Sequence, residues 1–161
     1  MSLANQGGSP AADEGVWGVA PFTMKLSRSQ KREGMFLLLY QSLLNDDTID
    51  ELVQSNIEAY EMLPDESIAV TVEAAQDYAD KADEIINRYS ATRRVERIAA
   101  ISVAVMRLAL YEMDCVDEEE IPDKVAINEA IELCKKYAGG DDYKFVSAIL
   151  GSYYREKNGT T

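Results

Sequence analysis

Apolar residues in this chain recur mostly every three to four positions, the spacing of a helix with one buried face. No segment shows the strict alternation of a half-buried strand. The spacing therefore predicts an all-α protein. Six helices are expected, over about residues 27–43, 48–63, 67–89, 92–113, 122–138 and 141–153.

Local signals support several of these helix ends. Thr48-x-x-Glu51 has the form of a capping box, in which each of the two side chains accepts a hydrogen bond from the other residue's backbone. Gly139-Gly140 is a typical helix stop, and a carboxylate at 141 or 142 is placed to cap the helix that follows.

The predicted helix at 92–113 differs from the others because its apolar residues cover every side. It should therefore lie at the centre of the core. Arg107 sits near its middle, and a buried guanidinium requires a carboxylate partner or a path to solvent. Glu129 is the partner we expect from the sequence.

The 161 residues suffice for one domain of ordinary composition. Residues 1–23 are rich in Gly, Ala, Ser and Pro, and we interpret them as a flexible leader or an artificial extension. The domain is expected over 24–161. No apolar run approaches a membrane span and no secretion signal is visible, so we expect a cytoplasmic protein.

Charge is distributed unevenly along the chain. The net charge is −13, which by itself argues against a nucleic-acid partner. Residues 25–44, however, carry four basic side chains against the single acid Glu33, a net of +3. Because salt screens charges over about 8–10 Å, such a segment can bind a polyanion locally despite an acidic body.

The residue types of most catalytic sites are missing. There is no histidine, and the two cysteines, Cys115 and Cys134, are isolated and expected to be buried thiols. No glycine-rich phosphate loop is present. A pair of catalytic carboxylates is the remaining option, but most acidic residues of a helical protein lie on solvated faces. We expect neither enzymatic activity nor a metal or cofactor.

Three segments resemble the NusB family. The first is KREGMFLLLYQ at 31–41, and the second is VMRLALYEM at 105–113. The third and most specific is IPDKVAINEAIELCKKY at 121–137, followed by Asp141 and by KFV at 144–146. Their order and spacing cover nearly all of residues 25–155.

This resemblance implies a fold of two packed three-helix bundles. It implies a factor in transcription antitermination that binds boxA-type single-stranded leader RNA of ribosomal operons. It also implies a protein partner, the ribosomal protein NusE, and recruitment to the RNA polymerase antitermination complex.

The resemblance also assigns an RNA-binding role to the basic opening segment. The alternative is an ordinary solvated helix end. Ser29 and Gln30 interrupt the basic run that the family carries here, which predicts weaker RNA affinity. The residues assigned to RNA phosphates are Lys25, Arg28, Lys31 and Arg32.

A second group near residue 143 matches family positions beside the RNA. Phe145 and Tyr143 offer rings for base stacking, and Lys144 offers a cation. Phe145 is also the first apolar residue of its helix, so a core role is an equal alternative. Asp141 matches a carboxylate beside the RNA, with helix capping as its alternative.

Two further predictions concern the protein partner and a second basic cluster. Tyr40 matches a position near NusE, with core packing as the alternative, and Ser102 lies near a partner-facing position that is acidic in relatives. A second basic cluster either extends the RNA track or pairs with nearby acids, which we favour. It consists of Arg88, Arg93, Arg94 and Arg97.

Two other function classes remain open. One is a protein–protein adaptor or homodimer with little RNA affinity, suggested by the acidic body and the thinned basic segment. The other is an enzyme, because the same fold serves as the RNA-binding domain of an rRNA cytosine methyltransferase. The absent histidine and the lack of a methyl-donor domain in the sequence disfavour it.

Overall fold

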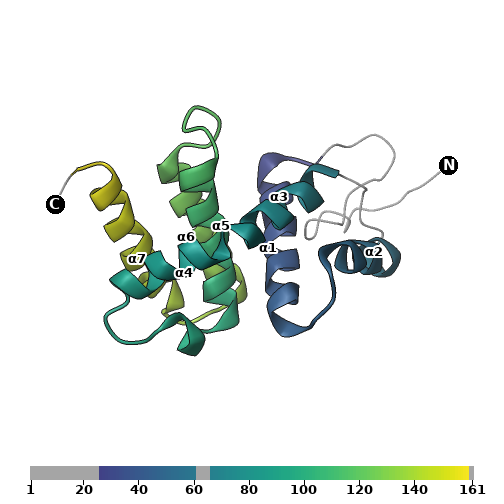
Figure 1. The fold of residues 1–161 in the computed structure, drawn as a ribbon, viewed down its shortest axis with the longest axis horizontal. Coiled ribbons are helices and arrows are strands. Elements are labelled where there is room, and N and C mark those ends of the chain that lie inside the picture. Colours follow the sequence, from purple (N-terminus) through teal and green to yellow (C-terminus); the bar gives the residue numbers. More distant parts are fainter. Residues whose placement is uncertain (1–25, 61–65, 160–161) are drawn as a thin grey trace. The chain divides into compact units, whose positions relative to one another are not determined.

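The computed structural model describes residues 26–60 and 66–159, which contain helices and no strand (Figure 1). The predicted all-α class is confirmed. The chain divides into two compact units, residues 1–73 and 74–161. The helices are α1 (Arg28–Leu44), α2 (Ile49–Tyr60), α3 (Glu66–Asp77), α4 (Ala79–Tyr89), the 3₁₀ turn η3 (Val95–Arg97), α5 (Ala100–Cys115), α6 (Asp123–Tyr137) and α7 (Asp142–Lys157).

In the first unit, α1 packs against α2. The predicted capping box starts α2: the Thr48 N–H donates to Glu51 Oε1 at 2.8 Å, and the Glu51 N–H donates to Thr48 Oγ1 at 3.1 Å. Asn56, which is buried on α2, donates to the Gln41 side chain of α1 at 2.9 Å. The predicted leader at 1–23 lies outside the described residues.

In the second unit, α5 packs against α4, α6 and α7, as its all-round apolar sequence predicts. Met106, Leu108 and Leu110 are almost completely buried. Around them, α4 contributes Ile86 and α7 contributes Ile149, both also buried. The central position predicted for this helix within its unit is therefore confirmed.

Arg107 of α5 does find a carboxylate, but it is Asp83 of α4 rather than the expected Glu129. Arg107 donates from Nε to Asp83 Oδ1 at 2.9 Å and from Nη2 to Oδ2 at 2.7 Å. Both side chains are 21% exposed, so this two-point ion pair lies at the edge of the core.

Two predicted helices were wrong in extent. The helix expected at 67–89 is interrupted at Tyr78, which separates α3 from α4. The helix expected at 92–113 begins at Ala100, because Ala99 is extended and the 3₁₀ turn η3 precedes it. Gly139 and Gly140 end α6 with φ of 74° and 59°, the left-handed conformation that favours glycine.

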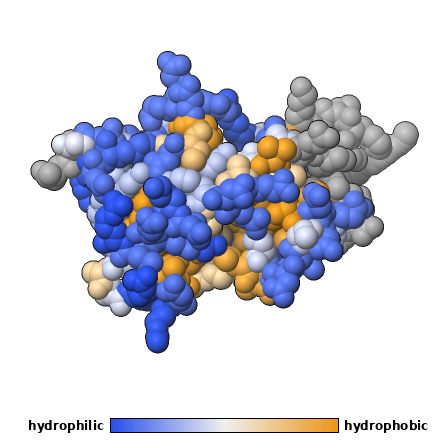
Figure 2. Space-filling view, in the orientation of Figure 1, coloured by the Kyte–Doolittle hydropathy of each residue, from blue (hydrophilic) through white to orange (hydrophobic). Residues whose placement is uncertain are grey.

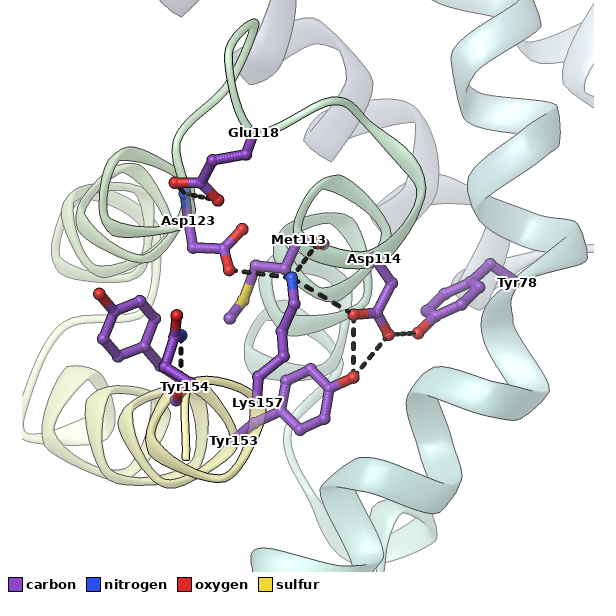
Figure 3. Close-up of polar contacts among 9 residues, drawn as sticks. Tyr78, Met113, Asp114, Glu118, Asp123, Tyr153, Tyr154 and Lys157 are labelled. Atoms are coloured by element: carbon purple, nitrogen blue, oxygen red, sulfur yellow. Dashed lines mark hydrogen bonds and ion pairs between the residues drawn. The ribbon is translucent and has the colours of Figure 1, made fainter. Parts of the chain in front are cut away.

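The interruption at Tyr78 belongs to a polar network that joins the ends of several helices (Figure 3). Asp114 accepts hydrogen bonds from the hydroxyls of Tyr78 and Tyr153. Lys157 of α7 donates to Asp123 Oδ2 at 2.9 Å and to the Met113 carbonyl. Burial first, and the hydrogen bond to Asp114 second, raise the pKa of Tyr78 and of Tyr153.

Candidate nucleic-acid interface

The amino end of α1 presents part of the predicted basic segment. Ser27 caps the helix by accepting the Gln30 N–H at 3.1 Å, and Gln30 Oε1 accepts the Ser27 N–H at 2.8 Å. This capping box fixes the first turn, in which Arg28 is exposed and Lys31 is half-buried. Lys25 lies outside the described residues.

Arg32 departs from the prediction. It was expected to contact RNA phosphates, yet only 6% of the residue is exposed. A guanidinium with so little accessible surface cannot reach a phosphate without moving. Arg28, Arg32 and Phe36 follow one another at four-residue spacing and so share one side of α1. Along this side the residues change from exposed at Arg28 to buried at Arg32 and Phe36, and the sequence pattern did not show where the buried part begins.

The amino end of α7 gathers the second predicted group. Asp141 occupies the N-cap position, but its side chain makes no capping hydrogen bond. Its carboxylate lies 3.7 Å from Lys144 Nζ, and these two side chains are 83% and 64% exposed. The predicted capping role of the Asp141 side chain is therefore wrong, and its carboxylate faces solvent beside a cation.

Both aromatic rings in this turn are half-buried, and each lies under a cation from another element. The Arg93 guanidinium carbon is 4.6 Å from the ring centroid of Phe145, and Lys135 Nζ is 4.9 Å from that of Tyr143. Phe145 is thus not simply a core residue, unlike fully buried Val146 next to it. We call Arg93, Lys135, Tyr143, Lys144 and Phe145 the α7 cation–aromatic surface.

Sequence reasoning did not identify Lys135, because the contact depends on how α6 and α7 pack. Pairing with acids, the alternative we favoured for the second basic cluster, holds for Arg88 and Arg94 but not for Arg93 or Arg97 among the described residues. Arg88 Nη1 lies 2.7 Å from Glu156 Oε1, and Arg94 lies 3.7 Å from Glu96. Arg93 lies over a ring instead.

The two residues predicted to contact the protein partner differ in accessibility. Tyr40 is half-buried and its ring stacks on Phe36 with centroids 6.2 Å apart, so it has both a core contact and some exposed surface. Ser102 is only 2% exposed, and its Oγ lies 3.9 Å from Cys134 Sγ. A buried hydroxyl has no surface to offer a partner, so the prediction for Ser102 does not fit the structure.

The cysteines also differ from each other. Cys134 is buried as predicted, and burial raises the pKa of its thiol, which keeps it protonated. Cys115 is exposed, contrary to the prediction, because it ends α5 where the chain leaves the core. Within residues 26–60 and 66–159 no His, Cys, Asp or Glu cluster suits a metal ion.

Most of the visible face of α4–α7 is hydrophilic (Figure 2). None of the described helices combines the length and apolar character needed to cross a bilayer.

Comparisons with known proteins agree on one family. The family model described as "NusB family" matches residues 29–155. The transcription antitermination protein NusB of Acetivibrio thermocellus is 32% identical over 134 residues, covering 82% of this chain and 91% of that protein. Its counterpart in Clostridium botulinum strain Alaska E43 is 30% identical over 135 residues, covering 81% and 100%.

Solved structures show the same fold. NusB of T. maritima superposes with a TM-score of 0.71 at 28% identity, covering 83% of this chain and 94% of that one. A crystal structure of antitermination factors NusB and NusE in complex with double-stranded RNA gives a TM-score of 0.69 at 23% identity, covering 80% and 96%. At that identity, the second likeness concerns the fold alone.

Proposed function

The chain belongs to the NusB family of transcription antitermination factors rather than to a family of enzymes, and we propose that it binds boxA-type single-stranded leader RNA together with NusE. In this role it joins the RNA polymerase antitermination complex, which places its action in the cytoplasm. The observation that carries the proposal is the α7 cation–aromatic surface, which combines rings for bases with cations for phosphates.

The chemistry of this surface suits an unpaired RNA strand. Unstacked bases bind by stacking on aromatic rings, and lysine and arginine neutralise the phosphates between them. Arg28 and Lys31 of α1 supply further cations. The three cations of the α7 cation–aromatic surface can contact about three phosphates, each adding about −0.7 to the slope of log affinity against log salt. The expected slope is therefore about −2, typical of modest affinity that a protein partner must reinforce.

A protein–protein adaptor or homodimer with little RNA affinity is the second candidate. The burial of Arg32 and the net charge of −13 favour it, because both reduce the cationic surface available to RNA. Tyr40 is the residue we retain for the NusE contact, since part of its side chain is accessible.

Titration of a labelled boxA-like single-stranded RNA with the full chain, with and without NusE, separates these functions. We expect binding to the boxA sequence over a scrambled RNA, strengthened by NusE. The double variant Arg28→Glu with Lys31→Glu should lose this binding while its thermal melt stays close to the wild type. A matched control is Lys124→Glu with Arg155→Glu, which changes the net charge equally. Lys124 lies near the start of α6 and Arg155 near the end of α7, which are the ends of these helices away from the α7 cation–aromatic surface. Equal affinity for boxA and scrambled RNA in the presence of NusE would exclude specific RNA binding and support the adaptor function instead.

A further inference from the structure

Arg93 and Arg97 are exposed basic residues between α4 and α5 that make no ion pair among the described residues, and of these two only Arg93 lies over an aromatic ring. In a chain of net charge −13, the neighbouring Arg88 and Arg94 each lie within 4.0 Å of a carboxylate. No such ion pair holds the exposed Arg93 among the described residues. Its guanidinium lies over the ring of Phe145 instead. A cation placed on an aromatic ring at the surface, and not neutralised by an acid, remains available to an anion.

The backbone around Arg93 is fixed on both sides. Ser90 Oγ accepts the Arg93 N–H at 3.3 Å and donates to the Arg93 carbonyl. Asn87 Oδ1 accepts the Val95 N–H at 2.8 Å. The side chain, in contrast, is held only by its contact with the ring, as far as the described part of the chain shows. Arg93 can therefore leave the ring by rotating its side chain, without any change in the loop.

The planar guanidinium covers the ring face on which a nucleobase would stack. Arginine and nucleobases are both flat, delocalised groups that stack on aromatic rings. One face of Phe145 cannot hold both groups in direct contact. RNA binding at Phe145 therefore requires Arg93 either to leave the ring or to stack on the face of the base that points away from the ring.

We propose that Arg93 is an RNA-contacting residue that exchanges partners on binding, an inference that rests on the RNA-binding function proposed above. In the free protein, its guanidinium covers Phe145. In the complex, an unpaired base takes the ring face and Arg93 binds an adjacent phosphate. Lys144 in the same turn lies 3.7 Å from the exposed carboxylate of Asp141, and in the complex it exchanges this contact for the neighbouring phosphate.

The test compares Arg93→Ala with Arg94→Ala, which removes the same charge from the next residue. Affinity for the boxA-like RNA is measured with NusE present at several salt concentrations. Losing one phosphate contact makes the slope of log affinity against log salt shallower by about 0.7. Between 1 M and 0.1 M salt, the affinity of the variant therefore rises about fivefold less than that of the wild type. We expect this smaller rise for Arg93→Ala and wild-type affinity for Arg94→Ala.

If Arg93→Ala binds RNA as tightly as Arg94→Ala, or more tightly than the wild type, Arg93 only shields the ring and the inference is overturned. If the wild type itself does not bind the RNA with NusE present, the proposed function fails as well. The two failures are thus distinguishable.

A fluorescent base analogue in the RNA tests the stacking half of the exchange. Its fluorescence should be quenched on binding to the wild type and to Arg93→Ala, because the ring is present in both. Quenching should be absent with Phe145→Leu, which keeps an apolar side chain of similar size. Unchanged quenching with Phe145→Leu would contradict the exchange.

Discussion

Replacing Asp83 by asparagine removes the negative charge that faces Arg107 but preserves the shape of the side chain. Arg107 lies in the middle of α5, the most buried helix of the second unit, and contacts Asp83 of α4 through two hydrogen bonds of 2.9 and 2.7 Å. The variant therefore leaves a guanidinium at the edge of the core without its counter-ion.

The size of the effect follows from exposure. Breaking a fully buried ion pair costs about 3–5 kcal/mol, whereas an exposed pair contributes about 0–1 kcal/mol. Asp83 and Arg107 are each 21% exposed, so Arg107 can recover part of its hydration. We expect the free energy of unfolding to fall by about 2 kcal/mol. For a chain of this length, that corresponds to a melting temperature lower by about 4–8 °C.

Arg88 and Glu156 provide a matched comparison, since this pair also joins α4 to another helix of the same unit. Arg88 Nη1 donates to both carboxylate oxygens at 2.7 and 3.0 Å, but the side chains are 49% and 48% exposed. We expect their coupling to be below about 1 kcal/mol.

Urea denaturation of two double-mutant cycles measures both couplings. One cycle uses Asp83→Asn and Arg107→Gln, and the other uses Arg88→Gln and Glu156→Gln. If the two coupling energies are equal, burial does not set the strength of the Asp83–Arg107 pair, and the reasoning above is refuted.

Two further predictions follow from the polar network and from the acidic loop. The pKa values of Tyr78 and Tyr153 are raised above the ordinary value, by burial first and by Asp114 second, so their contribution to stability is complete below about pH 10 and is lost as pH rises further. The urea midpoints measured at pH 8 and at pH 11 should differ less in a variant with both tyrosines changed to phenylalanine than in the wild type. An equal difference in the two proteins would contradict this assignment. Changing Glu119 and Glu120 to glutamine should raise the association rate for RNA at low salt and leave the dissociation rate unchanged, as stopped-flow binding measures. A slower dissociation would instead indicate that the loop contacts the RNA.

The helices were predictable wherever their determinants are local. The capping box at Thr48 and the glycines after α6 act within a few residues, so they could be identified from spacing alone. The central position of α5 within its unit was equally predictable, because apolar residues on every side leave no face for solvent.

What could not be predicted depends on contacts between distant segments. Nothing in the local sequence at Tyr78 breaks a helix, yet its hydroxyl binds Asp114, 36 residues away. The choice of Asp83 over Glu129 as the partner of Arg107 likewise depends on how α4 packs against α5. The same holds for the candidate site, where periodicity placed Phe145 on α7 but gave no indication that Arg93 covers its ring.

Distance limits how far the acidic loop at 117–120 can weaken a site for a polyanion. The acidic loop at 117–120 precedes α6, and the α7 cation–aromatic surface begins at the opposite end of that helix. α6 has 15 residues, so its ends lie about 22 Å apart. This is more than twice the screening length of about 8 Å at physiological salt, so the loop hardly weakens contacts made at the surface. Its repulsion acts mainly on the approach of RNA. For RNA bound at this surface as proposed above, the net charge of the whole chain therefore affects how fast RNA arrives, whereas the few cations beside Phe145 and Tyr143 determine how long it stays.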